Sequence, residues 1–107
     1  MRKWLLASVV LLAGGFSAAS AQDYPTRNIT MMIPFAAGGP TDTVGRLIAE
    51  SMAKTLGKTI VVENLAGAGG TRAPGQLAKS EPDGYTILLH HIGMSTAPTL
   101  YRKLPFN

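Results

Sequence analysis

The apolar positions form three short blocks, separated by two segments with helical spacing. The blocks are ITMMIPF at residues 29–35, TIVVEN at 59–64 and YTILLH at 85–90. The first block alternates little between apolar and polar positions, which is typical of a strand covered on both faces in a parallel sheet. The second is rich in β-branched residues and predicts a second strand, and the third block predicts a third. Pro34 cannot donate a ladder hydrogen bond, so we expect the first strand to end there.

A long helix is predicted between the first two blocks. Gly39 fits the N-cap, Pro40 the first helical position, Asp42 the first turn and Gly57 the C-cap. The apolar spacing predicts one buried stripe, made of Val44, Leu47, Ile48, Ser51, Met52 and Leu56. A charged face consists of Arg46, Glu50 and Lys54.

The remaining segments are shorter. Residues 71–80 predict a second helix, with Pro74 in its first turn and Gly75 weakening it. Residues 99–104 predict at most one further helical turn. Strands that alternate with helices predict an α/β fold with a parallel sheet and right-handed crossovers. The loops after the strands then share the carboxyl edge, where ligands bind in such sheets.

The first 21 residues predict a secretory signal peptide. Arg2 and Lys3 give a positive start, an apolar run follows as far as Phe16, and Ala-Ser-Ala precedes a cleavage point before Gln22. The run is shorter than the roughly 20 residues of a membrane span. An uncleaved N-terminal anchor is the alternative.

Composition excludes several classes of protein. Removing Arg2 and Lys3 lowers the formal charge from +4 to +2, and the 86 remaining residues contain no cationic cluster interleaved with aromatics. This argues against nucleic acid as a partner. The chain has no Cys, so it forms no disulfides and carries no Cys-linked lipid. A chain of this size buries only a modest core.

The first glycine-rich loop, FAAGGPTD at residues 35–42, could bind an anion. The amides of Ala37 to Gly39 and the helix N-terminus would hold a carboxylate or phosphate. The alternative is a tight turn that ends in an acidic helix residue. The loop is not a phosphate-binding Walker motif, because no Gly-Lys-Ser/Thr follows.

The second glycine-rich loop, NLAGAGGT at residues 64–71, could form a concave nest of N–H groups. The alternative is a flexible connection. A dinucleotide site is rejected because the glycine spacing is imperfect and the acidic residues downstream, Glu81 and Asp83, fall in a turn.

The two histidines, His90 and His91, do not predict a metal site. Adjacent residues of a strand point to opposite faces, and no other ligand type stands at suitable spacing. We expect one ring near the core and the other at the ligand edge. No nucleophile–base set or G-x-S-x-G elbow is present, which favours a binding protein over an enzyme.

Taken together, YPTRNITMMIPFAAGGPTD, VVENLAGAGGT and PDGYTILLHHIGMSTAPTLYRKLP closely resemble the solute receptors of tripartite tricarboxylate transporters, the Bug family. The resemblance runs from Tyr24 to the last residue. It implies a periplasmic, monomeric receptor of the type II periplasmic-binding-protein class, with two α/β domains around a cleft and no cofactor. Such receptors bind small carboxylates and deliver them to a permease with one small and one large membrane subunit.

The resemblance also implies which residues bind the ligand. In the family, turns after the first strands grip the carboxylate, partly through ordered water. The matching positions are Phe35, Ala36, Ala37, Gly38, Gly39, Asp42, Ala68, Gly69, Gly70, Thr71 and His91. Asp42 is itself an anion, so we expect it to order its loop or hold a water rather than touch a carboxylate.

Two departures from the family pattern stand out. Arg72, Pro74 and Gly75 replace apolar or small helix formers, which leaves the start of the second helix open. Family members have roughly three hundred residues, about two domains. Residues 22–107 then correspond to the N-terminal part of the first domain, without the second, and we expect weak ligand binding and marginal stability. The alternatives are an exported α/β enzyme acting on a phosphorylated small molecule, or a truncated product without function.

Overall fold

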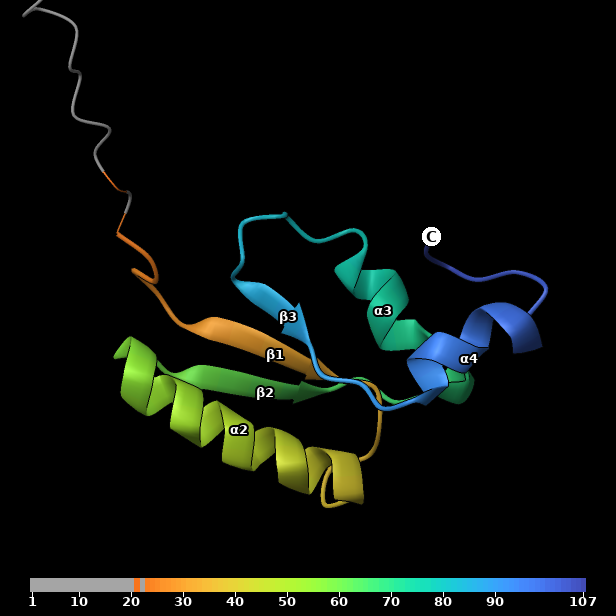
Figure 1. The fold of residues 1–107 in the computed structure, drawn as a ribbon, viewed down its shortest axis with the longest axis horizontal. Helices are drawn as coiled ribbons and strands as arrows, with labels where there is room; N and C mark the ends of the chain where they lie inside the picture. Colours follow the sequence, from red (N-terminus) through yellow and green to blue (C-terminus); the bar gives the residue numbers. More distant parts are fainter. Residues whose placement is uncertain (1–20, 22) are drawn as a thin grey trace, which may run out of the picture.

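The computed structural model describes residue 21 and residues 23–107. The predicted signal peptide therefore lies, apart from its last residue, outside the described residues. Figure 1 shows a small sheet with helices packed around it. Its elements are β1 (Ile29–Ile33), α2 (Pro40–Leu56), β2 (Ile60–Asn64), the 3-10 turn η1 (Ala68–Gly70), α3 (Arg72–Leu77), β3 (Thr86–Leu88) and α4 (Gly93–Leu100).

The sheet has three strands in the order β2-β1-β3, and both pairings are parallel. The register places Thr30 of β1 beside Val61 of β2 and Thr86 of β3. All three arrowheads point toward the end of the molecule where α4 lies (Figure 1). The predicted α/β class with a parallel sheet is confirmed, and β1 ends directly before Pro34 as expected.

Both ends of α2 follow the prediction. Gly39 is the extended N-cap residue, with φ −76° and ψ 172°, and Pro40 opens the helix. At the other end Gly57 adopts the left-handed conformation, with φ 67°, and its N–H donates to the Ala53 carbonyl at 2.9 Å. The helix therefore stops where its local sequence directs it to stop.

The predicted buried stripe of α2 is wrong in its first half. Val44, Leu47 and Ile48 are 52%, 65% and 38% exposed. The residues that face the sheet are Asp42, Gly45 and Ala49, continued by the partly buried Met52, Ala53 and Leu56. Gly45 explains the difference, because a Cβ there would run into the side chains of Ile33 and Leu89. The helix approaches the sheet closely through small residues, and this excludes the larger apolar side chains from the contact.

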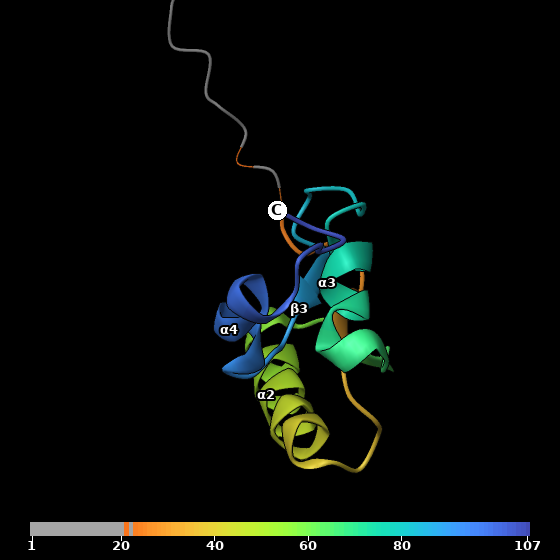
Figure 2. The ribbon, with the colours of Figure 1, turned by 90° about the vertical axis from the view of Figure 1, so that its right-hand side faces the viewer.

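The core lies between α2 and the sheet. Ile29, Met31 and Ile33 alternate along β1 toward α2, where they cluster with Ala49 and Ile60. Met32 points to the other face and is also buried. Because α3 contacts β1 and β3, the central strand is covered by helices on two sides (Figure 2).

The C-terminal third differs from the prediction in three ways. α3 is shorter than residues 71–80, and η1 occupies what was expected to be open loop. The turn predicted at residues 99–104 is wrong, because α4 ends at Leu100. α4 instead begins at Gly93, and within it Ser95 Oγ donates to the Ile92 carbonyl and Thr96 Oγ1 to the Gly93 carbonyl.

Candidate functional site

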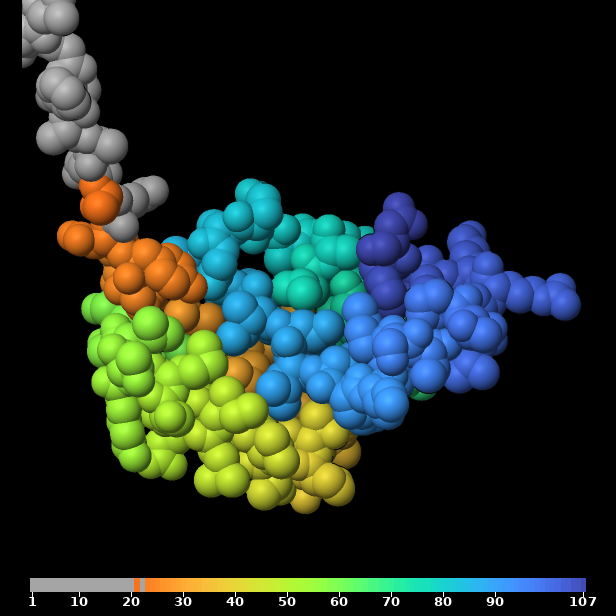
Figure 3. Space-filling view, in the orientation of Figure 1, coloured from red at the N-terminus to blue at the C-terminus, as the bar shows by residue number. Residues whose placement is uncertain are grey.

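Three loops meet at the carboxyl edge of the sheet, where the sequence predicts a ligand site. Loop 1 (residues 34–39) leads from β1 into α2, loop 2 (residues 65–71, with η1) leads from β2 into α3, and loop 3 (residues 89–92) leads from β3 into α4. Figure 3 shows loop 3 lying against the first turns of α2. The parallel sheet brings the loops together because all three strands end at this edge.

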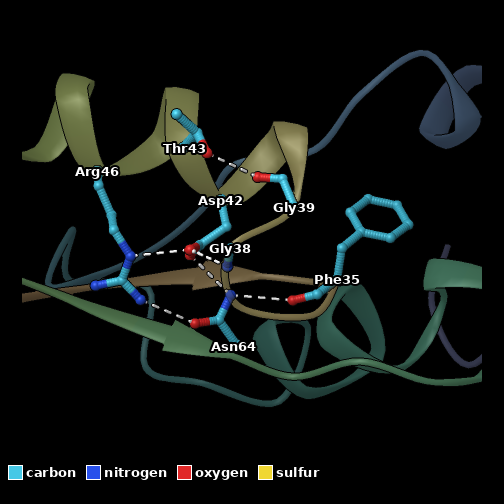
Figure 4. Close-up of polar contacts among 7 residues, drawn as sticks. All are labelled: Phe35, Gly38, Gly39, Asp42, Thr43, Arg46 and Asn64. Atoms are coloured by element: carbon cyan, nitrogen blue, oxygen red, sulfur yellow. Dashed lines mark hydrogen bonds and ion pairs between the residues drawn. The ribbon is translucent and has the colours of Figure 1, made fainter.

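A buried carboxylate in the first turn of α2 lies against loop 1. The side chain of Asp42 is only 3% exposed and accepts three hydrogen bonds (Figure 4). Its Oδ2 atom accepts from the Gly38 amide at 2.8 Å and from Arg46 Nε at 2.9 Å. Its Oδ1 atom accepts from Asn64 Nδ2 at 2.9 Å. The carboxylate therefore joins loop 1, helix α2 and the end of β2.

These partners stabilise the charged form of Asp42. The hydrogen bond from Arg46 contributes most, followed by those from the Gly38 amide and Asn64, and together they lower the pKa of Asp42 from 3.8 to about 2. Asp42 is therefore ionised at neutral pH and has its acceptors engaged by the protein. This geometry agrees with the expectation that Asp42 orders its loop.

The amides of loop 1 and of the first turn of α2 divide into two groups. The Gly38 amide donates to Asp42, and the Gly39 amide donates to the Ala36 carbonyl at 3.3 Å, so both glycine amides are engaged within the chain. The amides of Ala37, Thr41 and Asp42 have no acceptor among the residues that the structure describes. This narrows the predicted set of anion-binding amides to Ala37 and the first turn of α2.

Loop 2 folds into a tight turn. Gly70 N–H donates to the Gly67 carbonyl at 3.0 Å, and Thr71 Oγ1 donates to the Ala68 carbonyl at 2.8 Å. Within the described part of the chain, the amides of Ala68 and Gly69 lack an acceptor. Ala68 and Gly69 are exposed, whereas Gly70 and Thr71 are buried. Of the four predicted residues in loop 2, the first two can therefore meet a ligand directly.

Tyr101, directly after α4, lies against loop 2. Gly69 has a φ of +61°, and a Cβ at this position would collide with the Tyr101 hydroxyl. This contact could not be predicted from the sequence, because the two residues belong to elements far apart along the chain. Tyr101 is 42% exposed, so the edge of the site extends to the end of α4.

Loop 3 contributes both histidine rings to this edge. The His91 ring stacks on Phe35 at a centroid distance of 4.3 Å, and the His90 ring meets Phe35 edge-on at 5.4 Å. The prediction that the two rings point to opposite faces is wrong, because β3 ends at Leu88 and strand alternation no longer applies. His90 is half-buried and His91 exposed, in agreement with one ring near the core and one at the ligand edge.

Hydrogen bonds fix the tautomer of each histidine. His90 Nδ1 accepts from the His91 amide at 2.8 Å, so Nε2 carries the hydrogen and donates to the Gly70 carbonyl at 3.0 Å. His91 Nδ1 accepts from the Gly93 amide at 2.8 Å, so its Nε2 is also a donor. His90 thereby links loop 3 to loop 2, and His91 presents an N–H at the exposed edge.

Two hollows flank the start of α2. One of about 440 Å³ is lined by Ala37, Gly38, Asp42, Thr43, Arg46, Leu47 and Glu50. The other, of about 260 Å³, is lined by Pro40, Thr41, Val44, Leu89, His90 and His91. The predicted site residues are thus divided: Ala37, Gly38 and Asp42 border the first hollow and His91 the second, while the other predicted residues border neither. No group of three potential metal ligands occurs within the described residues.

Residues 44–107 match the family described as the tripartite tricarboxylate transporter family receptor. The chain belongs to this family. A protein of Agrobacterium vitis, from the TAR-I ttuE-ttuC' intergenic region, is 54% identical over 89 residues, which cover 82% of this chain and 26% of the relative. The resemblance seen in the sequence is thereby confirmed, and the family is one of transporter receptors rather than enzymes.

Two solved structures of similar proteins share the fold of this receptor-family chain. The periplasmic binding protein BugD is 62% identical, with a TM-score of 0.72, over 74% of this chain and 26% of BugD. MatC from Rhodopseudomonas palustris, solved with bound malate, is 49% identical, with a TM-score of 0.75, over 78% of this chain and 29% of MatC. The chain therefore spans about a quarter to a third of the length of these relatives. In the part of the chain that the structure describes, no helix could span a membrane.

Proposed function

We propose that this chain forms one wall of a periplasmic receptor that binds a small dicarboxylate and delivers it to the permease subunits of a tripartite transporter. The observation that carries the proposal is the set of amides without acceptors on loops 1 and 2, in a fold shared with malate-bound MatC. Backbone amides at a helix N-terminus and in a glycine turn suit an anion.

The ionised Asp42 determines which groups of the site can bind a ligand carboxylate. A ligand carboxylate placed directly on Asp42 would meet a like charge, whose acceptors are already engaged. The ligand carboxylate instead accepts from the amides of Ala37 or Thr41 on one side and of Ala68 or Gly69 on the other, directly or through a water. The His91 Nε2 donor at the exposed edge supplies a further hydrogen bond.

The proposed wall is incomplete as a binding site. The hollows beside α2 are open to solvent, and cleft receptors gain affinity by closing a second body around the ligand. We therefore expect the chain alone to bind dicarboxylates weakly or not at all. The proposed periplasmic location is supported by the predicted signal peptide and by the likeness to BugD.

A chimera tests the proposal. The segment of MatC that corresponds to residues 24–107 is replaced by the segment of this chain, and folding is checked by circular dichroism and a thermal melt. The 49% identity between the two makes the exchange conservative. The chimera is expected to bind malate or another dicarboxylate in isothermal titration calorimetry, and not the dimethyl ester, which lacks the charges.

Two other results of the chimera experiment would count against the proposal. A folded chimera that binds no dicarboxylate would overturn the proposal. Binding of phosphate esters in place of dicarboxylates would favour the alternative of an enzyme for phosphorylated substrates.

A further inference from the structure

Asn64, the last residue of β2, is fully engaged by its neighbours (Figure 4). Its Nδ2 atom donates to the Phe35 carbonyl at 3.0 Å and to Asp42 Oδ1 at 2.9 Å. Its Oδ1 atom accepts from Arg46 Nη2 at 3.2 Å. Both hydrogens of the amide group and its oxygen therefore have partners.

These bonds connect loop 1 and the start of α2 to the end of β2, the residue from which loop 2 continues. Phe35 lies in loop 1 and Asp42 in the first turn of α2, and loop 2 begins at the residue after Asn64. The strand ladder itself ends with the Leu65 amide donating to the Ile33 carbonyl at 2.8 Å. Beyond that bond, the hydrogen bonds that hold loop 1 and the first turn of α2 to the start of loop 2, among the described residues, are those of Asn64.

The chemistry of the cluster requires an amide at this position. Exchanging Oδ1 and Nδ2 would set the oxygen against a carboxylate and a carbonyl, so the surroundings fix the amide orientation. An Asp side chain has the same shape but would place a second carboxylate beside Asp42. An Ala side chain would leave the Phe35 carbonyl and one oxygen of Asp42 without this donor.

We propose that Asn64 is a positioning residue that fixes loops 1 and 2 relative to each other, so that their amides act on one anionic ligand. The ligand half of this statement rests on the proposed function above. Asn64 itself touches neither the ligand nor the amides that would hold it; it acts through Asp42 and the Phe35 carbonyl. The charged groups bonded to it are Asp42 and Arg46, both from α2.

The coupling is tested by NMR on the full chain, without any ligand. Asn64→Asp is compared with Asn28→Asp, which adds the same charge at an exposed residue near the opposite edge of the sheet. At pH values where both carboxylates of the new pair are ionised, Asn64→Asp is expected to shift the resonances of the Gly38 amide and of the loop 2 amides together. Below it, one carboxyl carries a proton and can donate to the other, so both sets of resonances return toward the wild-type positions.

A variant that merely lost its local structure would not show this return of the resonances at acid pH. Asn64→Ala, which adds no charge, is expected to disturb both loops at every pH without recovery. Asn64→Ala also tests the proposal if Asn64→Asp does not fold at neutral pH. A change at Gly38 with no change in loop 2, in either variant, would overturn the proposal, as would an equal response from Asn28→Asp.

The MatC chimera adds a functional measurement. There Asn64→Asp is expected to weaken malate binding about tenfold at pH 8, the effect of losing one charge-assisted hydrogen bond, with partial recovery at pH 5. Asn28→Asp should leave the affinity within about twofold, because a rim charge far from the site acts weakly. Unchanged affinity in Asn64→Asp would overturn the positioning role. A parent chimera that binds no dicarboxylate would count against the proposed function alone, and the NMR comparison would still decide the coupling.

Discussion

The two edges of the sheet are held together in different ways. At the amino edge, side chains close on each other: the Arg27 guanidinium lies 3.9 Å from the Tyr85 ring centroid and is 3.0 Å from Asp83. The Tyr85 hydroxyl accepts from the Thr26 amide at 2.9 Å, and the Tyr24 hydroxyl donates to the Gly84 carbonyl at 2.6 Å. At the carboxyl edge a buried carboxylate orders the backbone, and several amides keep no acceptor among the described residues.

This difference indicates that the amino edge holds segments of the chain together, whereas the carboxyl edge is a candidate binding surface. The amino edge ties the segment before β1 to the turn before β3 and uses its polar groups in doing so. The carboxyl edge uses side chains such as Asp42 and Asn64 to hold loops whose own amides stay available. Substitutions at the carboxyl edge are therefore expected to affect function, and substitutions at either edge are expected to affect stability.

The largest effect is expected where α2 approaches the carboxyl half of the sheet. Gly45→Val would push its side chain into Ile33 and Leu89 and cost about 3 kcal/mol in the free energy of unfolding. The control is Leu47→Ala on the exposed face of α2, expected within about 0.5 kcal/mol. Urea unfolding measures both. Equal losses of unfolding free energy in the two variants would contradict the observed packing and favour the buried stripe predicted from the sequence.

A smaller loss is expected in loop 2. Gly69→Ala places a Cβ at a left-handed residue and against the Tyr101 hydroxyl, which together should cost about 2 kcal/mol. Gly57→Ala has the same backbone strain with open space around it and should cost about 1 kcal/mol. The comparison isolates the contact with Tyr101. If thermal melts rank the two alike, α4 does not press on loop 2.

At the amino edge, Tyr85→Phe keeps the ring beneath Arg27 and removes the hydroxyl that bonds Thr26. The expected loss is about 1 kcal/mol, the usual value of one hydrogen bond. Because the two edges are separately fastened, the NMR resonances of loops 1 and 2 should not move. Shifts in those loops would show that the edges are coupled and would break the comparison.

The smallest effect at working pH concerns Asp42. Its pKa is about 2 in the folded chain and 3.8 as a free group, so its contribution to stability is present above about pH 4 and is lost as the pH falls toward 2. Between pH 5 and 8 nothing should change. In an acid titration the Gly38 amide resonance is expected to move in this window, whereas in Asp42→Asn it should not. A wild-type Gly38 amide that stays constant down to pH 2 would contradict the assigned bond.

Much of the fold follows from local sequence. Both caps of α2, the end of β1 before Pro34 and the parallel α/β order were predictable, because they depend on residues a few positions apart. The glycine loops were also located correctly along the chain. Which of their amides are engaged could not be predicted, since this depends on the side chain of Asp42 turning back to Gly38.

The sequence by itself determined the family, the three strands, α2 and α3, and the edge where the loops gather. Only the tertiary structure decided which face of α2 meets the sheet, because hydrophobic spacing counts apolar side chains and does not register that Gly45 permits a closer approach. It also decided the role of Asn64, whose partners Asp42 and Phe35 lie 22 and 29 positions away in sequence. Contacts at such separations form only once the parallel strands have brought their carboxyl ends together.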